Sequence, residues 1–179
     1  IIIRRVASGA SPAFPLWDIM EGDNAPKSPA LDKRGPMKFV FLMDPLETVV
    51  PAKDTSFDLM LAAVARGNEV FHLSSGGLSV EAGRVAMNTT TVLPRDDEDE
   101  PFDILDARVL SDDEIDAVFI RTDPPFNERY LMDTWLLDLL PPRVFVMNRP
   151  SGIRSCNEKI WANRFPELCP ETLLTADWE

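Results

Sequence analysis

The sequence predicts an α/β domain built on a mostly parallel sheet, and three observations lead to this fold class. Residues 38–73 alternate strand, helix and strand, which is the βαβ unit that joins parallel strands through a right-handed crossover. Residues 117–120 form a short β-branched apolar run, typical of a strand buried on both faces. A helical pattern over residues 127–140 and an apolar run at 144–147 repeat the alternation. Sheets of this class bind ligands beyond the carboxyl ends of their strands.

The first βαβ unit is defined by clear local patterns. Its first strand is expected at residues 38–43 and its second at residues 69–73. Thr55 and Asp58 have the spacing of a capping box, which predicts that the intervening helix begins there. The apolar stripe of this helix consists of Phe57, Met60, Leu61 and Val64. Gly67 then supplies a left-handed stop.

The sequence of residues 74–110 predicts antiparallel strands at one edge of the sheet. A turn is expected at residues 74–77, followed by a hairpin over 78–93 that reverses around Gly83. Residues 104–110 are expected to add one more edge strand. The acidic run RDDEDE at 95–100 is interpreted as a solvated loop rather than a metal site, because nothing holds its carboxylates in a cage.

The last third of the chain continues the alternation less regularly. After the strand at 144–147, a loop over residues 148–154 is expected to lead into a helix. Ser155 and Glu158 have capping-box spacing, so this helix is expected to begin at Ser155 and to run to about residue 165. Residues 169–175 are expected to be extended.

Length and composition are those of one globular domain. The chain has 179 residues, 45% of them hydrophobic, which is enough to bury a proper core. Residues 1–36 mix Pro, Gly, Ser and Asp without an apolar period, and we expect them to form a flexible leader. Leu131, Met132 and Leu136 leave open whether the chain is a homo-oligomer, because they fit a core or a subunit contact equally well.

Charge and cysteine content exclude several classes of partner. The formal net charge is -12 without a basic cluster, so nucleic acid would be repelled. Cys156 and Cys169 are too few for a disulfide framework and match no zinc pattern, which favours a cytoplasmic protein. No apolar run approaches the ~20 residues of a membrane helix, so no membrane partner is expected.

Positively charged side chains follow three of the predicted parallel strands. Lys53 lies beyond the first strand and Arg121 directly after the central one. Arg149 and Arg154 follow the strand at 144–147. Because the carboxyl ends of parallel strands share one edge of the sheet, we expect these cations to converge there. On an acidic protein, such a cluster predicts a site for a carboxylate or a phosphate.

Other residues have a structural and a functional interpretation. Lys159 would lie near the positive end of its helix, and its pattern suits a bound phosphate and plain solvent exposure equally. Asp44 and Asp123 each precede a proline, which favours turn formation over ligand contact. Ser56 is expected to help start its helix. His72, the only histidine, is expected to be a packed or edge-exposed strand residue rather than a general base, and neither a glycine-rich phosphate loop nor a nucleophilic triad is recognisable.

Five segments resemble the amino-terminal domain of prokaryotic glutathione synthetase, an ATP-grasp ligase. They keep the family's order and spacing over some 140 residues. The segments are FLMDP at 41–45, KDTSF at 53–57, RTDPPF at 121–126, RSCNEK at 154–159 and PETLLT at 170–175. The resemblance implies a Rossmann-like pre-ATP-grasp fold at residues 37–165, with a mostly parallel sheet and helices on both faces. Residues 166–179 would then begin a linker into an ATP-grasp domain.

The resemblance also implies a reaction and a set of site residues. In the family, ATP with Mg²⁺ phosphorylates the cysteinyl carboxylate of γ-glutamylcysteine, and glycine attacks to give glutathione, ADP and phosphate. The lysine of the NEK motif, here Lys159, reaches the ATP phosphates, and the arginine before DPPF, here Arg121, faces the peptide. The full set of expected substrate-binding residues is Arg121, Asp123, Asp44, Lys53 and Ser56.

No catalytic residue or metal ligand is expected in this segment, because the family places its ATP-grasp subdomains after PETLLT. The 179 residues alone are therefore expected to show no ligase turnover. Two alternatives remain: a stand-alone module for binding or assembly without catalysis, and part of another ATP-grasp carboxylate-amine ligase.

Overall fold

The computed structural model describes residues 35–177, apart from the side chains of Glu158 and Lys159. These residues fall into two compact units, residues 35–155 and residues 156–177. The expected leader, residues 1–36, lies outside the described residues except for its last two. Within the described part of the chain, no helix has the length and apolar character needed to span a bilayer.

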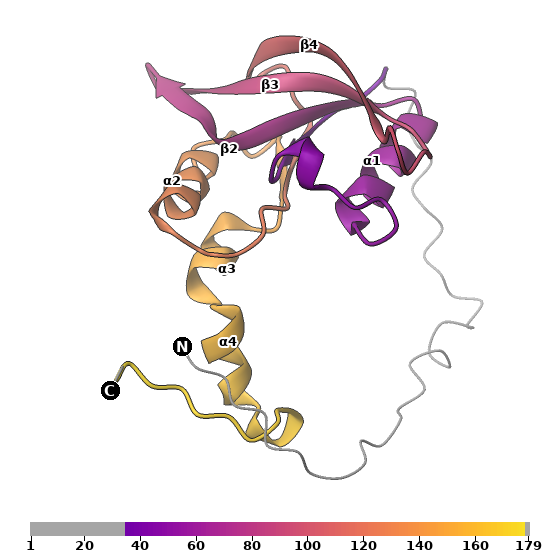
Figure 1. The fold of residues 1–179 in the computed structure, drawn as a ribbon. Coiled ribbons are helices and arrows are strands. Elements are labelled where there is room, and N and C mark those ends of the chain that lie inside the picture. The colour runs from indigo at the N-terminus through magenta and orange to yellow at the C-terminus, as the bar shows by residue number, and fades with distance from the viewer. Residues whose placement is uncertain (1–34, 178–179) are drawn as a thin grey trace, which may run out of the picture. The chain divides into compact units, whose positions relative to one another are not determined.

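A six-stranded sheet forms the main unit, with the strand order β4-β3-β2-β1-β5-β6 (Figure 1). The strands are β1 (Lys38–Leu42), β2 (Glu69–Glu81), β3 (Arg84–Pro94), β4 (Phe102–Ser111), β5 (Ala117–Ile120) and β6 (Phe145–Met147). β1 is parallel to β2 and β5, and β5 is parallel to β6. β3 is antiparallel to β2 and β4. The mostly parallel sheet, the hairpin and the additional edge strand are thus confirmed.

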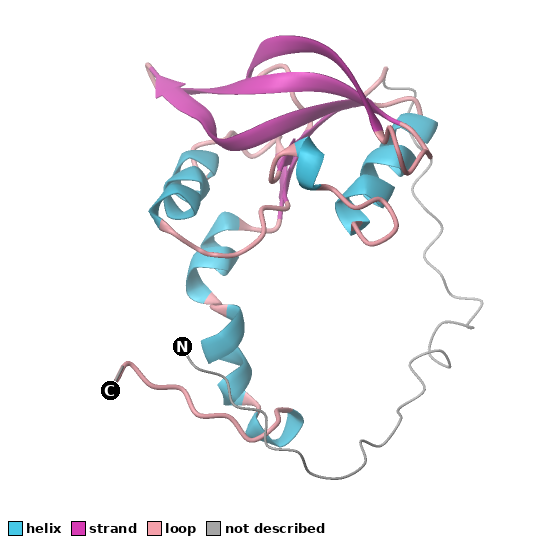
Figure 2. Ribbon diagram, viewed as in Figure 1, coloured by secondary structure: helices cyan, strands magenta, loops and turns pink. Residues whose placement is uncertain are grey.

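Helices cover both faces of the sheet (Figure 2). α1 (Thr55–Ala65) packs on one face, and α2 (Glu128–Leu137) and α3 (Pro150–Ser155) pack on the other. Side chains of β1 alternate between the two layers: Phe41 is buried with Met60 of α1, and Leu42 with Leu137 of α2. Burying each such side chain stabilises the fold by about 1.5 to 3 kcal/mol. The expected arrangement of helices on both faces is confirmed.

The start of α1 differs from the capping-box prediction by one residue. Asp54 is the N-cap, and its carboxylate accepts hydrogen bonds from Ser56 N at 2.7 Å and Phe57 N at 3.4 Å. Aspartate is among the best N-caps because its side-chain oxygen satisfies amides that have no partner within the helix. The predicted stop is confirmed, since Gly67 has a φ of 78°.

The prediction of a turn at residues 74–77 is wrong, because β2 continues through them with a shift of register between Leu73 and Leu78. Gly76 adopts a φ of 84°, which glycine tolerates at little cost. Gly77 permits a close approach, since a Cβ there would lie 2.7 Å from Leu73 Cδ1. The two glycines therefore bend the strand instead of ending it.

Helix α2 holds this bend from the side. The carboxylate of Asp133, which is 2% exposed, accepts hydrogen bonds from Ser75 Oγ at 2.5 Å and Gly76 N at 3.2 Å. This anchor orients the helix on the sheet. Leu136 consequently packs against the core, whereas Met132 is 49% exposed.

The predicted loop at residues 148–154 is wrong in its second half, which is α3. Pro150 occupies the first helical position, where its missing N–H is no loss. The following helix, α4 (Glu158–Trp161), does not begin at Ser155, whose hydroxyl donates to Ser151 O. Asn157 caps α4 instead, since its Oδ1 accepts a hydrogen bond from Ile160 N at 3.1 Å. Asparagine is among the residues preferred at this position.

The C-terminal unit contains little regular structure beyond α4. Two short 3-10 turns, η3 (Ala162–Arg164) and η4 (Pro166–Leu168), follow it, and a further 3-10 turn in the main unit is η2 (Leu46–Thr48). Residues 169–175 form no strand, so the expected extended segment has no partner in the sheet among the described residues.

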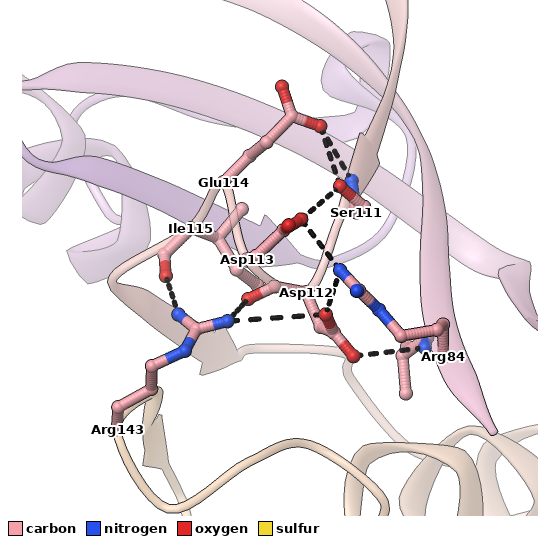
Figure 3. A network of polar contacts seen from close by, with 8 residues as sticks. Arg84, Ser111, Asp112, Asp113, Glu114, Ile115 and Arg143 are labelled. Carbon is pink, nitrogen blue, oxygen red and sulfur yellow. Dashed lines mark hydrogen bonds and ion pairs between the residues drawn. The ribbon is translucent and has the colours of Figure 1, made fainter.

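A network of ion pairs joins β3, the connection from β4 to β5, and the residues before β6 (Figure 3). Asp112 is 6% exposed and pairs with Arg84 at 2.8 Å, while its second oxygen accepts from Val85 N at 3.3 Å. Arg143 donates to the main-chain oxygen of Asp112. Asp113 also pairs with Arg84, at 2.8 Å. The network fastens the far end of the hairpin to the strands on the other side of β1.

Candidate functional site

A pocket with a cavity volume of about 290 Å³ lies beyond the carboxyl ends of β1 and β5, at the start of α1. The structure brings all five expected substrate-binding residues to this pocket. Its complete lining consists of Met43, Asp44, Thr48, Val49, Val50, Lys53, Asp54, Thr55, Ser56, Arg121 and Asp123.

The strand order explains the position of the pocket. From β1 the chain first moves outward to β2, β3 and β4, and it then returns to the other side of β1 with β5. The loops that follow β1 and β5 therefore diverge around the point where the strand order reverses. A crevice forms at such a switch point in open α/β sheets.

Arg121 is held in place by two hydroxyl groups at the first turn of α1. Its Nε donates to Ser56 Oγ at 2.9 Å, and its Nη2 donates to Thr55 Oγ1 at 2.7 Å. Neither partner carries a charge, and Arg121 forms no ion pair with any described residue. The guanidinium is therefore oriented without being neutralised, which suits a carboxylate or phosphate ligand.

Lys53 adds a second positive charge to the pocket. It is exposed and, within residues 35–177, has no ion-pair partner. The N-terminus of α1 contributes a positive dipole end at the same place, although Asp54 offsets part of it as the N-cap. The positive charge of the pocket thus comes mainly from Lys53 and Arg121.

Three carboxylates, those of Asp44, Asp54 and Asp123, also line the pocket. Asp44 Oδ2 accepts a hydrogen bond from Asp123 N at 2.9 Å, which ties the loop after β1 to the loop after β5. The main-chain oxygen of Asp44 lies 3.1 Å from His72 Nε2. His72 is 7% exposed, so of the two expected placements, packed or edge-exposed, the structure shows the packed one. Asp44 acts in the turn, as its sequence predicts, and also faces the pocket.

The remaining arginines do not join the site. Arg154 donates to Thr134 O at 3.0 Å and pairs with Asp138, so it fastens α3 to α2. Arg149 is exposed and does not line the pocket. The prediction that both converge with Arg121 is therefore wrong, because α3 begins at Pro150 and carries Arg154 toward α2.

The position of the Lys159 side chain relative to the pocket is not described. The backbone of Lys159 belongs to the C-terminal unit. The expected contact with ATP phosphate stays a prediction. Among the described side chains, no group of three or more His, Cys, Asp or Glu residues is arranged to hold a metal ion.

Sequence reasoning missed three polar residues of the pocket, Thr48, Asp54 and Thr55, and three apolar ones, Met43, Val49 and Val50. Asp54 and Thr55 were available from the motif DTSF, because an aspartate directly before a helix is a strong N-cap. Thr48 has no comparable pattern, since it reaches the pocket only through the 3-10 turn η2.

The arrangement can bind a small molecule that carries both signs of charge. A carboxylate would be recognised by Arg121 and Lys53, and an ammonium group by Asp44 and Asp123. An open, mostly parallel sheet with such a pocket at its switch point defines a Rossmann-like ligand-binding domain.

Comparisons with known proteins narrow this class to a family. The sequence profile described as "Prokaryotic glutathione synthetase, N-terminal domain" matches residues 37–154. A glutathione synthetase from Gloeobacter violaceus is 42% identical over 147 residues, covering 76% of this chain and 44% of the relative. A glutathione synthetase from Nostoc sp. is 38% identical over 151 residues, covering 79% of this chain and 47% of the relative. The chain belongs to the prokaryotic glutathione synthetase N-terminal domain family, and it spans less than half the length of these curated relatives.

Proposed function

We propose that the chain supplies the peptide-binding side of a glutathione synthetase, which joins γ-glutamylcysteine to glycine at the expense of ATP. The observation that carries the proposal is Arg121, a cation that is oriented by Ser56 and Thr55 and has no carboxylate partner among the described residues. Membership of the family supports the assignment of the reaction.

The chemistry of the peptide matches the pocket. γ-Glutamylcysteine carries two carboxylates and one ammonium group. Arg121 and Lys53 offer charge-assisted hydrogen bonds to a carboxylate, and Asp44 and Asp123 offer them to the ammonium group. Because Ser56 and Thr55 already hold the guanidinium, little side-chain entropy is lost when the peptide binds.

ATP would supply the phosphoryl group that activates the carboxylate, and Mg²⁺ would neutralise charge on the phosphates. The described side chains do not fit a magnesium site, so we place no metal ligand among them. The part of the relatives that the chain does not match amounts to more than half of their length. We therefore propose that the 179 residues alone do not form glutathione, and that Lys159 contacts the nucleotide in the whole enzyme.

A cytoplasmic location belongs to the same proposal. Cys156 and Cys169 are both free thiols, which is the usual state in a reducing compartment.

Isothermal titration calorimetry with γ-glutamylcysteine tests the pocket without turnover. We expect Arg121→Ala to weaken binding by about 1.5 to 3 kcal/mol, the scale of a hydrogen bond to a charged group. Arg66→Ala removes the same charge from the exposed far end of α1 and should leave the affinity unchanged. Equal affinities of Arg121→Ala and the unmodified chain, or no binding by the unmodified chain, would contradict the proposal.

A further inference from the structure

His72 of β2 lies behind the pocket, on the face of the sheet that α1 covers. Its neighbours Phe71 and Leu73 belong to the core layer on the other face, so the alternation of side chains along a strand places His72 on the α1 side. The ring is 7% exposed and does not line the pocket. A polar ring that is buried in this way needs a hydrogen-bond partner, and the partner is a residue of the pocket.

The hydrogen bond of His72 is made to the main-chain oxygen of Asp44, which lies 3.1 Å from Nε2. A carbonyl oxygen can only accept a hydrogen bond, so Nε2 must carry the hydrogen. In the neutral ring this bond selects the tautomer that has its proton on Nε2 and none on Nδ1. His72 therefore acts as a donor to Asp44.

This bond acts at the residue where the chain leaves β1. Met43 N still donates to β2, at 3.1 Å, and Asp44 is the next residue. Asp44 precedes Pro45, which restricts its backbone to extended conformations. The carbonyl of Asp44 is held by His72, and its carboxylate accepts from Asp123 N at 2.9 Å. Both the backbone and the side chain of Asp44 are thus fixed in direction.

One carboxylate oxygen of Asp44 is left for a ligand. Oδ2 accepts from Asp123 N, and within the described part of the chain no hydrogen bond or ion pair reaches Oδ1. The carboxylate of Asp54 differs, because it already caps α1 through Ser56 N and Phe57 N. Asp44 is therefore a charged acceptor that neutral groups orient without neutralising it.

We propose that His72 is a positioning residue for the ammonium group of the ligand and that it acts through Asp44. The proposal rests on the proposed function, in which Asp44 and Asp123 bind this group. The bond from Nε2 holds the Asp44 backbone, and the backbone determines where Oδ1 points in the pocket. Without this bond the carboxylate has more orientations, and ordering it on binding reduces the affinity.

The other end of the ligand does not depend on His72. Arg121 is oriented by Ser56 and Thr55, which belong to α1 and make no printed contact with His72 or Asp44. A change at His72 should therefore affect recognition of the ammonium group and leave recognition of the carboxylate intact. This difference separates a positioning role from a general contribution to folding.

Isothermal titration calorimetry with two ligands measures the difference. The first ligand is γ-glutamylcysteine, and the second is glutarylcysteine, in which a hydrogen atom replaces the ammonium group. We expect His72→Leu to weaken binding of γ-glutamylcysteine about threefold to tenfold, the scale of one hydrogen bond. The affinity for glutarylcysteine should stay unchanged.

A double-mutant cycle tests the route through Asp44. In a chain with Asp44→Ala, His72→Leu should not weaken binding of γ-glutamylcysteine further, because the carboxylate through which it acts is absent. Thr89→Val is the matched control. It removes another buried hydrogen bond to a main-chain oxygen, from Thr89 Oγ1 to Arg108 O at 2.7 Å, outside the pocket, and should leave both affinities unchanged.

Nitrogen-15 NMR of the unmodified chain tests the hydrogen bond without relying on a variant that folds. His72 is the only histidine, so its imidazole signals need no assignment. With the ring neutral, we expect the proton on Nε2.

Four results would each overturn the proposal and leave the proposed function standing. They are a neutral ring with its proton on Nδ1, full affinity of His72→Leu for γ-glutamylcysteine, an equal loss of affinity for both ligands, and an undiminished effect of His72→Leu beside Asp44→Ala. An unmodified chain that binds neither ligand would overturn the proposed function and this proposal together.

Discussion

Ser56 holds Arg121 across 65 residues of sequence. The hydroxyl of Ser56, a side chain that is 3% exposed, accepts a hydrogen bond from Arg121 Nε at 2.9 Å. Through this bond the first turn of α1 determines the direction of a guanidinium that comes from the loop after β5. The pocket is thus formed by two distant segments that have no pattern in common.

Ser56→Ala should weaken γ-glutamylcysteine binding by about 0.5 to 1.5 kcal/mol, because the guanidinium loses one of its two hydroxyl partners and is less well oriented. Calorimetry measures the change. Ser79→Ala removes an exposed hydroxyl from β2 and is the control, with no effect expected. A full retention of affinity in Ser56→Ala would show that Thr55 alone orients Arg121.

Asp54→Ala should lower the free energy of unfolding by about 0.5 to 2 kcal/mol, because two amides at the start of α1 lose their acceptor. Denaturant unfolding followed by circular dichroism measures it. Asp54→Asn keeps a capping oxygen without the charge, and we expect it to retain most of the stability. An equal loss in both variants would indicate that charge, and not capping, is the main contribution.

Gly77→Ala should destabilise the protein by about 1 to 3 kcal/mol, the usual cost of overpacking. The new Cβ would lie 2.7 Å from Leu73 Cδ1 and 3.0 Å from the main-chain oxygen of Ser74. Gly152→Ala is the matched control, because the nearest atom to its new Cβ would be Arg149 Cβ at 3.9 Å and alanine favours the helix α3. Thermal unfolding measures both effects. We expect the melting temperature of Gly77→Ala to fall and that of Gly152→Ala to rise or stay unchanged.

Acid should destabilise the protein through Asp113. Hydrogen bonds from the Ser111 hydroxyl and from Arg84 lower the pKa of Asp113 from 3.8 to about 2. As the pH falls, Asp113 is protonated in the unfolded chain at a higher pH than in the folded chain. The contribution of Asp113 to the free energy of unfolding is therefore complete above about pH 4 and is lost as the pH falls toward 2. The pKa of Glu114 is also lowered, chiefly by the hydrogen bond from the amide of Ser111. Protonation of Glu114 in acid therefore also destabilises the folded chain.

Asp113→Asn should make the free energy of unfolding less dependent on pH between about 4 and 2. Urea titrations across this range measure the slope, and added salt should reduce it in the unmodified chain because the pair is exposed. An unchanged slope in Asp113→Asn would contradict the assignment.

Local patterns predicted most of the fold because they act over a few residues. The apolar run at 117–120 became β5, and the helical stripe between Phe57 and Val64 became the buried side of α1. The predictions failed where a distant group decided the outcome. Residues 74–77 look like a turn, but Asp133 satisfies Ser75 and Gly76 from 57 or 58 residues away and keeps them in β2.

The site shows the same division. Lys53 and Arg121 were expected at one edge because parallel strands end together, and they line one pocket. Arg154 was expected beside them, but its bonds to Thr134 and Asp138 fasten it to α2 instead.

Residue order alone therefore specified the position of most strands, the first helix, the acidic character and the family motifs, since these depend on neighbours in the chain. Which charged side chains share a pocket, which face of α2 is buried and which strand edge stays open depended on contacts between segments far apart in sequence. Such contacts follow from the geometry of the whole fold, and no local pattern of residues encodes them.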